Sequence, residues 1–309
     1  MNKNIQISVV SPVYKAEKIL DELIVELKLT LSALNVRYEI ILVDDRSPDN
    51  CWGKMKELSK EHDEVKAVRL SKNFGQHPAI ISGLSLAKGD WVVVMDCDLQ
   101  DQPKEIEKLY KKALLGYDVV LAKRKERNDS FYKQTTSYVF SKVYGYFTDT
   151  NYDNEVANFG IYKKKVIHAI LSMSDYIKFF PLFVKHVGFN TISIEVEHSK
   201  RLEGTSSYSF YNLLKLAFNT IISFSNKPLK LVVKLGMLIS IFSMLFGVYN
   251  IYLSITGEIE VLGYSSIIIS IWFLFGVMVT IMGVIGIYLG KIFDQVKQRP
   301  VFIIDEVVG

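Results

Sequence analysis

An apolar run leads directly into two aspartates in the stretch WVVVMDCDLQD, which occupies residues 91–101. A short run of this kind, rich in β-branched residues, is typical of a strand that is buried on both faces of a sheet. Asp96 and Asp98 flank a single residue, so on an extended backbone their carboxylates share a face. Two neighbouring carboxylates repel each other unless a proton or a cation lies between them. The stretch therefore predicts a buried strand that ends in a candidate cation site.

Similar apolar runs recur on both sides of this stretch, at residues 7–10, 38–43, 65–70 and 119–122. Helical patterns separate them, and this alternation predicts an α/β domain with a parallel sheet that is covered by helices on both faces. Such sheets bind ligands beyond the carboxyl ends of their strands. The run at 38–43 stops at Asp44 and Asp45, which places a second acid pair at the same predicted edge.

Two long stretches near the C-terminal end contain no charged residue, from 235 to 257 and from 261 to 290. Each is longer than the roughly 20 residues that a helix needs to cross a bilayer. The linker between them carries Glu258 and Glu260, whereas lysines and an arginine flank the outer ends. Because basic flanks tend to stay in the cytoplasm, we expect a multi-pass protein of the cytoplasmic membrane with a transmembrane hairpin over residues 231–290.

The position of the predicted hairpin determines the other domain boundaries that we expect. Residues 1–207 form the expected cytosolic domain, and residues 291–309 form a cytosolic tail. Residues 208–230 are predicted to be an amphipathic helix and linker in contact with membrane lipids, with a core helix of the soluble domain as the alternative. Small residues of the second stretch would permit close helix approach or a homo-oligomer: Gly276, Gly283, Gly286 and Gly290.

Composition and missing motifs exclude several classes of protein. The chain of 309 residues is 49% apolar and 23% charged, and its net charge of +4 is too weak to indicate binding to nucleic acid. Cys51 and Cys97 are its two cysteines, and they form neither a zinc nor a redox motif. No Gly-x-Gly-x-x-Gly follows the first apolar run, and no P-loop sequence occurs. A dinucleotide-dependent dehydrogenase and a P-loop ATPase are therefore excluded.

Four motifs occur in a characteristic order: SPVY at 11–14, VDDRS at 43–47, NFGQH at 73–77 and MDCDLQDQP at 95–103. This set resembles family 2 glycosyltransferases of the GT-A fold, in particular the polyprenyl-phosphate branch of bactoprenol glucosyltransferases and dolichol-phosphate mannose synthases. The resemblance extends over the whole chain. It implies a Rossmann-like, mixed and mainly parallel sheet in an α/β domain. It also implies an inverting enzyme that moves one sugar from a nucleotide-sugar to a polyprenyl phosphate such as undecaprenyl phosphate, with Mg²⁺ or Mn²⁺ as cofactor.

The resemblance also implies roles for the matching positions. The donor, expected to be a UDP-sugar, would contact Pro12, Tyr14, Asp44, Asp45, Ser47, Lys72, Asp96 and Gln100. The metal would be held by Asp96, Asp98 and Gln100. Further catalytic positions would be Arg124, Lys133, Arg201, Asp153 and Glu155.

The chemistry of the expected acceptor explains the basic candidates. A phosphate monoester has a second pKa of about 6, so near neutral pH it is mostly a dianion and needs no base to become a nucleophile. The site must instead hold two anions close together, which suits Arg124, Lys133 and Arg201. Asp153 or Glu155 is expected to orient the acceptor or the sugar. Ser207 stands where the family usually has a lysine.

Several alternatives stay open. The Asp96–Asp98 pair could be a solvated acidic turn, and Asp44 and Asp45 could form a turn that caps the next helix. His77 fits a structural histidine better than a base. A saccharide acceptor would keep the same donor chemistry, although no tryptophan follows an arginine as in processive synthases. A non-catalytic membrane protein that binds nucleotide-sugars would show binding without turnover.

Overall fold

The computed structural model describes residues 5–124, 156–175, 179–197, 225, 227–256 and 263–309. These residues fall into two compact units. The first unit contains the described chain up to residue 197 together with residues 299–309. The second contains the two long helices that lie between them in the sequence.

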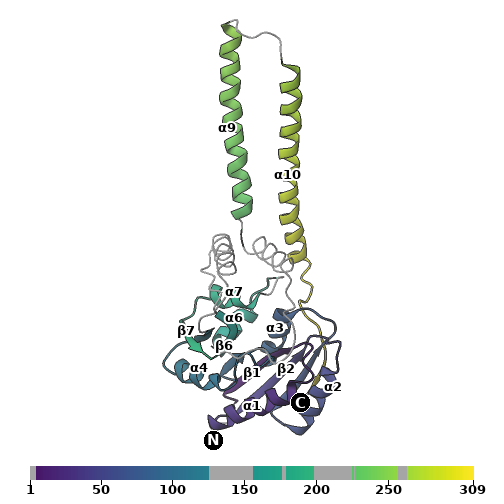
Figure 1. The fold of residues 1–309 in the computed structure, drawn as a ribbon, viewed down its shortest axis with the longest axis vertical. Helices are drawn as coiled ribbons and strands as arrows, with labels where there is room; N and C mark the ends of the chain where they lie inside the picture. Colours follow the sequence, from purple (N-terminus) through teal and green to yellow (C-terminus); the bar gives the residue numbers. More distant parts are fainter. Residues whose placement is uncertain (1–4, 125–155, 176–178, 198–224, 226, 257–262) are drawn as a thin grey trace. The chain divides into compact units, whose positions relative to one another are not determined.

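The first unit is built on one eight-stranded sheet of order β7-β5-β6-β4-β1-β2-β3-β8. Its strands are β1 (Ile7–Val13), β2 (Tyr38–Asp44), β3 (Val65–Leu70), β4 (Trp91–Val94), β5 (Val119–Arg124), β6 (Val156–Lys163), β7 (Thr191–Val196) and β8 (Ile304–Val308). Strands β4, β1, β2 and β3 pair in parallel, as do β5 and β7, whereas β6 and β8 run antiparallel to their neighbours. The sheet is therefore mixed and mainly parallel, as the sequence predicts (Figure 1).

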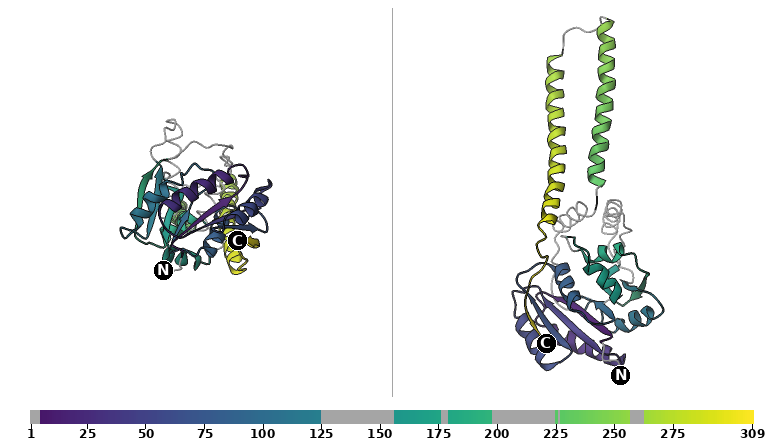
Figure 2. Two further views of the ribbon diagram at one scale, coloured as in Figure 1. Left: turned by 90° about the horizontal axis from the view of Figure 1, so that it is seen from below. Right: turned by 180° about the vertical axis from the view of Figure 1, so that it is seen from behind.

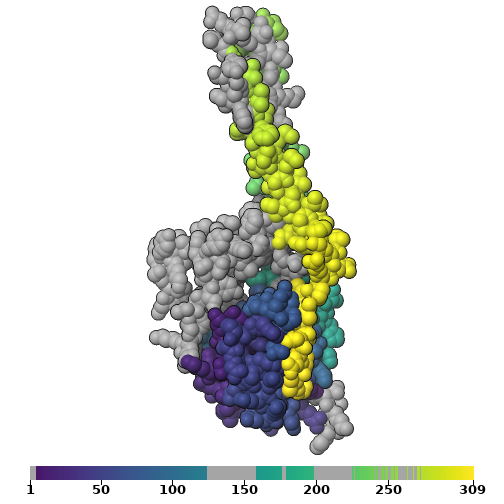
Figure 3. All heavy atoms as spheres, turned by 90° about the vertical axis from the view of Figure 1, so that its right-hand side faces the viewer, coloured from purple at the N-terminus to yellow at the C-terminus, as the bar shows by residue number. Residues whose placement is uncertain are grey.

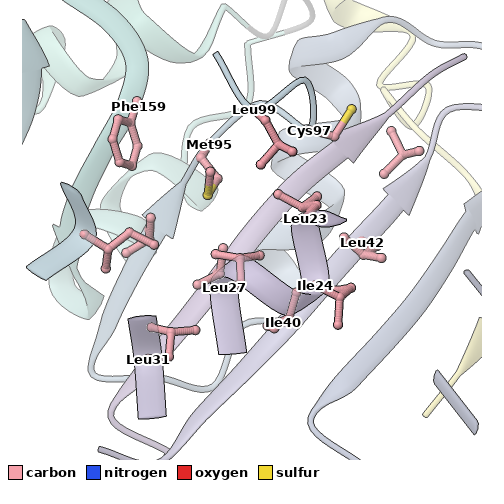
Figure 4. Close-up of a cluster of buried hydrophobic side chains, with 14 of the residues drawn as sticks. Leu23, Ile24, Leu27, Leu31, Ile40, Leu42, Met95, Cys97, Leu99 and Phe159 are labelled. Carbon is pink, nitrogen blue, oxygen red and sulfur yellow. The ribbon is translucent and has the colours of Figure 1, made fainter. Parts of the chain in front are cut away.

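Helices cover both faces of this sheet (Figures 1 and 2). One layer consists of α1 (Leu20–Ala33), α2 (Cys51–Glu61) and α4 (Glu105–Ala113), and the other of α3 (Gln76–Leu86), α6 (Lys164–Leu171) and α7 (Phe180–His186). In the first layer, Leu23 and Leu27 of α1 pack with Ile40 and Leu42 of β2 in one buried cluster (Figure 4). These side chains recur at helical spacing on α1 and at alternate positions on β2, which is why the pattern specifies both elements.

Helix α3 approaches the other face of the sheet closely because residue 83 is glycine. A Cβ at Gly83 would overlap the side chain of Val10 on β1 and lie 3.0 Å from Cγ2 of Val43 on β2. Val10 and Val43 are themselves fully buried. The missing Cβ thus lets α3 lie close to β1 and β2, and the first residues of the helix belong to the candidate site described below.

The structure confirms the five predicted strands and extends three of them, so that β1 runs to Val13, β2 to Asp44 and β5 to Arg124. Three strands of the sheet, β6, β7 and β8, were not predicted. Strand β8 comes from the segment that we expected to be a cytosolic tail, and it pairs with β3 at the edge of the sheet. Figure 3 shows these C-terminal residues in yellow against the blue spheres of the N-terminal part of the chain.

The second unit contains α9 (Lys227–Ile255) and α10 (Tyr264–Val296). Within the described residues, one stretch, Phe273–Val296, is long and apolar enough to cross a membrane, judged by its length and its mean hydropathy of 2.2. The Tyr288 hydroxyl of α10 donates a hydrogen bond to the carbonyl oxygen of Ser225 at 2.8 Å. The predicted interface helix over 208–224 lies outside the described residues.

Candidate active site

The carboxyl ends of β1, β2 and β4 lie together at one edge of the sheet. Val13 on β1 pairs with Asp44 on β2, and Val10 pairs with Val94 on β4. Since these strands are parallel neighbours, the Asp44–Asp45 pair follows the strand on one side of β1. The Asp96–Asp98 pair follows the strand on the other side. The prediction that both acid pairs lie at one edge is confirmed.

Asp45 anchors the loop that leads into α3. Its Oδ1 accepts the N–H of Phe74 at 2.7 Å and its Oδ2 accepts the N–H of Gly75 at 2.8 Å. Gly75 has a φ of +97°, which an L-residue with a side chain rarely adopts. Burial raises the pKa of Asp45, and the two N–H bonds oppose that shift. The residue expected to bind the nucleotide therefore also positions a neighbouring loop.

Asp44 and Ser47 form a turn at the end of β2. The N–H of Ser47 donates to Oδ1 of Asp44 at 2.8 Å, and Ser47 Oγ accepts the N–H of Lys15 at 2.7 Å. Burial raises the pKa of Asp44, partly offset by this N–H bond and by the charge of Arg69. The strand-ending turn considered in the sequence analysis is thus present at Asp44. It connects directly to the loop after β1, where Tyr14 is 45% exposed.

Gln76, the first residue of α3, reaches the other acid pair. Its amide Nε2 donates to Oδ1 of Asp96 at 2.7 Å. The segment before and into α3 therefore contacts both acid pairs, through Phe74 and Gly75 at Asp45 and through Gln76 at Asp96. Gln76 belongs to the NFGQH motif, and the resemblance assigned it no role. The sequence signal that could have indicated this role is a side-chain amide at the expected start of a helix within that motif.

Burial alternates along the Asp-x-Asp stretch. Cys97 is buried and Asp96 and Asp98 are partly exposed, which supports the predicted shared face of the two aspartates. The N–H of Gln100 donates to Oδ1 of Asp98 at 3.2 Å and closes a short turn. Burial raises the pKa of the Cys97 thiol to about 12, so this cysteine is a packing residue at physiological pH.

Asp96 and Asp98 fit a divalent cation that is bound together with a substrate. Among the described residues, no group of three His, Cys, Asp or Glu side chains is placed to hold a metal on its own. Mg²⁺ typically takes one or two carboxylates and completes its shell with phosphate oxygens and water. Each of the two aspartates uses one oxygen to accept an N–H, from Gln76 and Gln100 respectively. These bonds restrict the orientation of both carboxylates.

The other predicted site residues fall into two groups. Pro12 lies within β1, and Lys72 lies just before the loop at 73–75, with its ammonium 5.0 Å from the centre of the Phe74 ring. Arg124 ends β5, which is parallel to β4 with β6 between them, so its backbone reaches the same edge. The remaining candidates lie outside the described residues: Lys133, Asp153, Glu155 and Arg201.

His77 follows Gln76 in α3 and packs against Phe179, with the ring centres 4.6 Å apart. Burial lowers the pKa of His77 to about 4, so the imidazole is neutral at physiological pH. Within the described part of the chain, its Nδ1 has no hydrogen-bond partner. These observations favour the interpretation of His77 as a structural residue.

A mixed, mainly parallel α/β sheet with two acid pairs at its carboxyl edge is the arrangement of the GT-A fold. The fold is similar to that of mannosyl-3-phosphoglycerate synthase from Rubrobacter xylanophilus, with a TM-score of 0.52 and 13% identity. That similarity covers 84% of this chain and 78% of the other. Residues 8–171 match the sequence model of glycosyl transferase family 2, so the chain belongs to this family. It is therefore a glycosyltransferase.

Two relatives match almost the entire chain. A protein from Synechocystis, named as an uncharacterized glycosyltransferase, is 34% identical over 99% of this chain and 96% of its own length. The undecaprenyl-phosphate 4-deoxy-4-formamido-L-arabinose transferase of Proteus mirabilis is 34% identical over 98% of this chain and 94% of its own length. The similarity therefore extends beyond the family domain and includes the two long helices.

Proposed function

We propose that this glycosyltransferase moves one sugar from a nucleotide-sugar to undecaprenyl phosphate or a similar polyprenyl phosphate. The nearly full-length similarity to a Proteus mirabilis transferase named for that acceptor supports the acceptor class. The observation that carries the donor side is the loop at the start of α3, which contacts Asp45 and Asp96 together. It links the two acid pairs at the edge where sheets of this kind bind their ligands.

The donor in this proposal is a UDP-sugar that lies across the ends of β1, β2 and β4. Tyr14, Asp44 and Asp45 surround the base and ribose, together with Pro12, Ser47 and Lys72. Asp96 and Asp98, with Gln100 beside them, would hold Mg²⁺ or Mn²⁺. When bound, such a cation neutralises charge on the departing diphosphate. Gln76 keeps the Asp96 carboxylate oriented through its 2.7 Å hydrogen bond.

The acceptor phosphate is the nucleophile. One of its oxygens forms a bond to the anomeric carbon while the bond from that carbon to the diphosphate oxygen breaks, which inverts the anomeric centre. The products are the sugar-phosphate-polyprenol and the nucleoside diphosphate. Because the phosphate is already a dianion near pH 7, the protein needs positive charge rather than a base. Arg124, at the end of β5 on the same edge, is our candidate for this role.

We further propose that α9 and α10 cross the membrane as a hairpin. The sheet contains β7, which precedes α9 in the chain, and β8, which follows α10. A chain that leaves one folded unit and returns to it must cross a membrane an even number of times. If α10 spans the bilayer, the chain must cross it a second time, and α9 is our candidate for that crossing. The basic residues Lys227, Lys230 and Lys291 at the outer ends favour a cytosolic active site.

The proposal is tested with the purified full chain, undecaprenyl phosphate, a panel of labelled UDP-sugars, and Mg²⁺ or Mn²⁺. We expect one sugar to become linked to the lipid, and we expect this label to disappear with EDTA and in Asp98→Asn. The matched control is Asp21→Asn on the outer surface of α1, where the carboxylate is 59% exposed and pairs with Lys54. Failure of every donor to label the lipid, or full activity of Asp98→Asn, would contradict the proposal.

A further inference from the structure

Strand β8 carries two acidic side chains to the edge of the sheet beside the candidate site. It pairs antiparallel with β3, where Arg69 lies opposite Glu306 and Leu70 lies opposite Ile304. The register shift between these pairs leaves Asp305 as an extra residue. Such a bulge re-aims side chains locally. It allows the adjacent residues Asp305 and Glu306 to contact the same arginine, Arg69.

Asp305 contacts both Arg69 and Arg46. Among the described contacts, Glu306 pairs with Arg69 alone. Oδ2 of Asp305 accepts hydrogen bonds from Nη1 of Arg46 at 3.0 Å and from Nε of Arg69 at 3.1 Å, and it forms an ion pair with Nη2 of Arg69 at 2.8 Å. Glu306 pairs with Nη2 of Arg69 at 3.2 Å. The Arg69 guanidinium also stacks 4.9 Å from the ring centre of Trp52 on α2, so Arg69 has support besides Asp305. The contact specific to Asp305 is the one to Arg46.

Arg46 lies in the turn that organises the donor side of the candidate site. It separates Asp45, which anchors Phe74 and Gly75, from Ser47, which anchors Lys15. Its φ of +54° is a left-handed backbone conformation that costs energy for a residue with a side chain. The turn therefore needs support from its side-chain contacts. The Asp44–Ser47 bond supplies one such contact, and the Arg46–Asp305 pair supplies another.

We propose that Asp305 is a positioning residue for the donor site, because it holds Arg46 and so keeps the turn at 44–47 in its binding conformation. Loss of this pair leaves the left-handed Arg46 backbone without its side-chain anchor, between the two residues that organise the turn. The C-terminal strand thus contributes to donor binding without touching the donor. The identity of the ligand in this inference rests on the proposed function. The contacts of Asp305 do not depend on that function.

The first experiment needs no substrate. Hydrogen exchange is measured on the ligand-free full chain for Asp305→Asn and for the matched control Glu306→Gln, which lies on the same strand and removes the same charge. We expect exchange at residues 44–47 and 73–75 to accelerate about threefold or more in Asp305→Asn, as expected for loss of a partly exposed pair. Glu306→Gln should leave these segments at the wild-type rate. Equal rates in both variants would overturn the proposal.

The second experiment uses the UDP-sugar that labels the lipid. Asp305→Asn should raise the KM for this donor about threefold to fivefold with kcat unchanged. In the Arg46→Gln background, Asp305→Asn should cause no further rise, because the proposed effect of Asp305 on the donor site passes through Arg46 and not through Arg69. A further rise there, or a fall in kcat, would overturn the proposal. Faster exchange at 44–47 without transfer from any donor would support the positioning role and contradict the proposed function.

Discussion

Strand β2 carries a buried carboxylate near each end, and the two have different surroundings. Glu39 accepts bonds from the Lys66 ammonium at 2.7 Å, the Ser8 hydroxyl at 2.6 Å and the N–H of Lys88 at 2.7 Å. Burial alone would raise the pKa of Glu39, but these bonds together lower it. Burial raises the pKa of Asp44 despite its bond from Ser47. Glu39 therefore contributes to stability, whereas the surroundings of Asp44 penalise its charged form.

Replacing Glu39 with glutamine should destabilise the domain. The change leaves the Lys66 ammonium without its charged partner in a largely buried position, which costs about 1–3 kcal/mol. Because the folded pKa of Glu39 is lowered, its stabilising effect is present above the unfolded value of 4.5 and is lost as pH falls through the folded pKa. Thermal unfolding of the full chain at pH 7 should show a Tm lower by about 3–10 °C. The difference should shrink on acidification, and an unchanged Tm at pH 7 would contradict the expectation.

Replacing Asp44 with asparagine should weaken donor binding without lowering the stability of the domain, in contrast to Glu39→Gln. A raised folded pKa means that stability falls as pH rises from the unfolded value of 3.8, and the cost is fully present once the pH exceeds the folded pKa. Asparagine removes this cost, and its Oδ1 can still accept the N–H of Ser47. We expect a Tm at pH 7 equal to or above that of the wild type, with a donor KM at least about tenfold higher. A Tm loss as large as that of Glu39→Gln would show that Asp44 is structural.

The elements that the sequence predicts well are the ones specified by local pattern. Strands β1 to β4 are nearly continuous apolar runs, and their parallel order brings Asp45 and Asp96 to one edge. Strand β8 is different because its residues alternate between half-buried and exposed, and its contact from Asp305 to Arg69 spans 236 positions in the sequence. No local pattern reveals such a partner. The role of Gln76 was not predicted for a related reason, because its contact with Asp96 depends on where α3 packs.

Helix α3 offers a test of how packing positions the site. Gly83→Ala should push the helix away from Val10 and Val43, which costs about 1–3 kcal/mol, and should loosen the contact from Gln76 to Asp96. We expect a lower Tm and a higher KM for Mg²⁺ or Mn²⁺ in the transfer assay. Ser85→Ala is the matched control, because Ser85 lies on the exposed side of the same helix and bonds only the Ser82 carbonyl among the described contacts. Equal behaviour of the two variants would argue against a positioning role for α3.

At the scale of the whole molecule, the folded domain is completed by residues from both ends of the chain. The backbone carbonyl of Val308 accepts a hydrogen bond from the Ser59 hydroxyl at 3.1 Å, and the N–H of Ser71 donates to the carbonyl of Ile303 at 2.9 Å. Charge distribution could predict two apolar helices with basic flanks. It could not show that the segment after α10 is part of the sheet. Because the chain returns to the same sheet after α10, the segments before α9 and after α10 must lie on the same side of any membrane that the helices cross.

The constraint predicts that the linker at 257–262 and the segment after α10 lie on opposite sides of the membrane. Both native cysteines, Cys51 and Cys97, are buried, so background labelling should be low. In sealed, right-side-out vesicles, Glu260→Cys should react with a membrane-impermeant maleimide, whereas Gln298→Cys should react only after the vesicles are opened. The basic outer flanks and the acidic linker set this orientation. Equal reaction of the two cysteines in sealed vesicles would rule out the hairpin, because a chain anchored at both ends in one domain cannot cross the bilayer once.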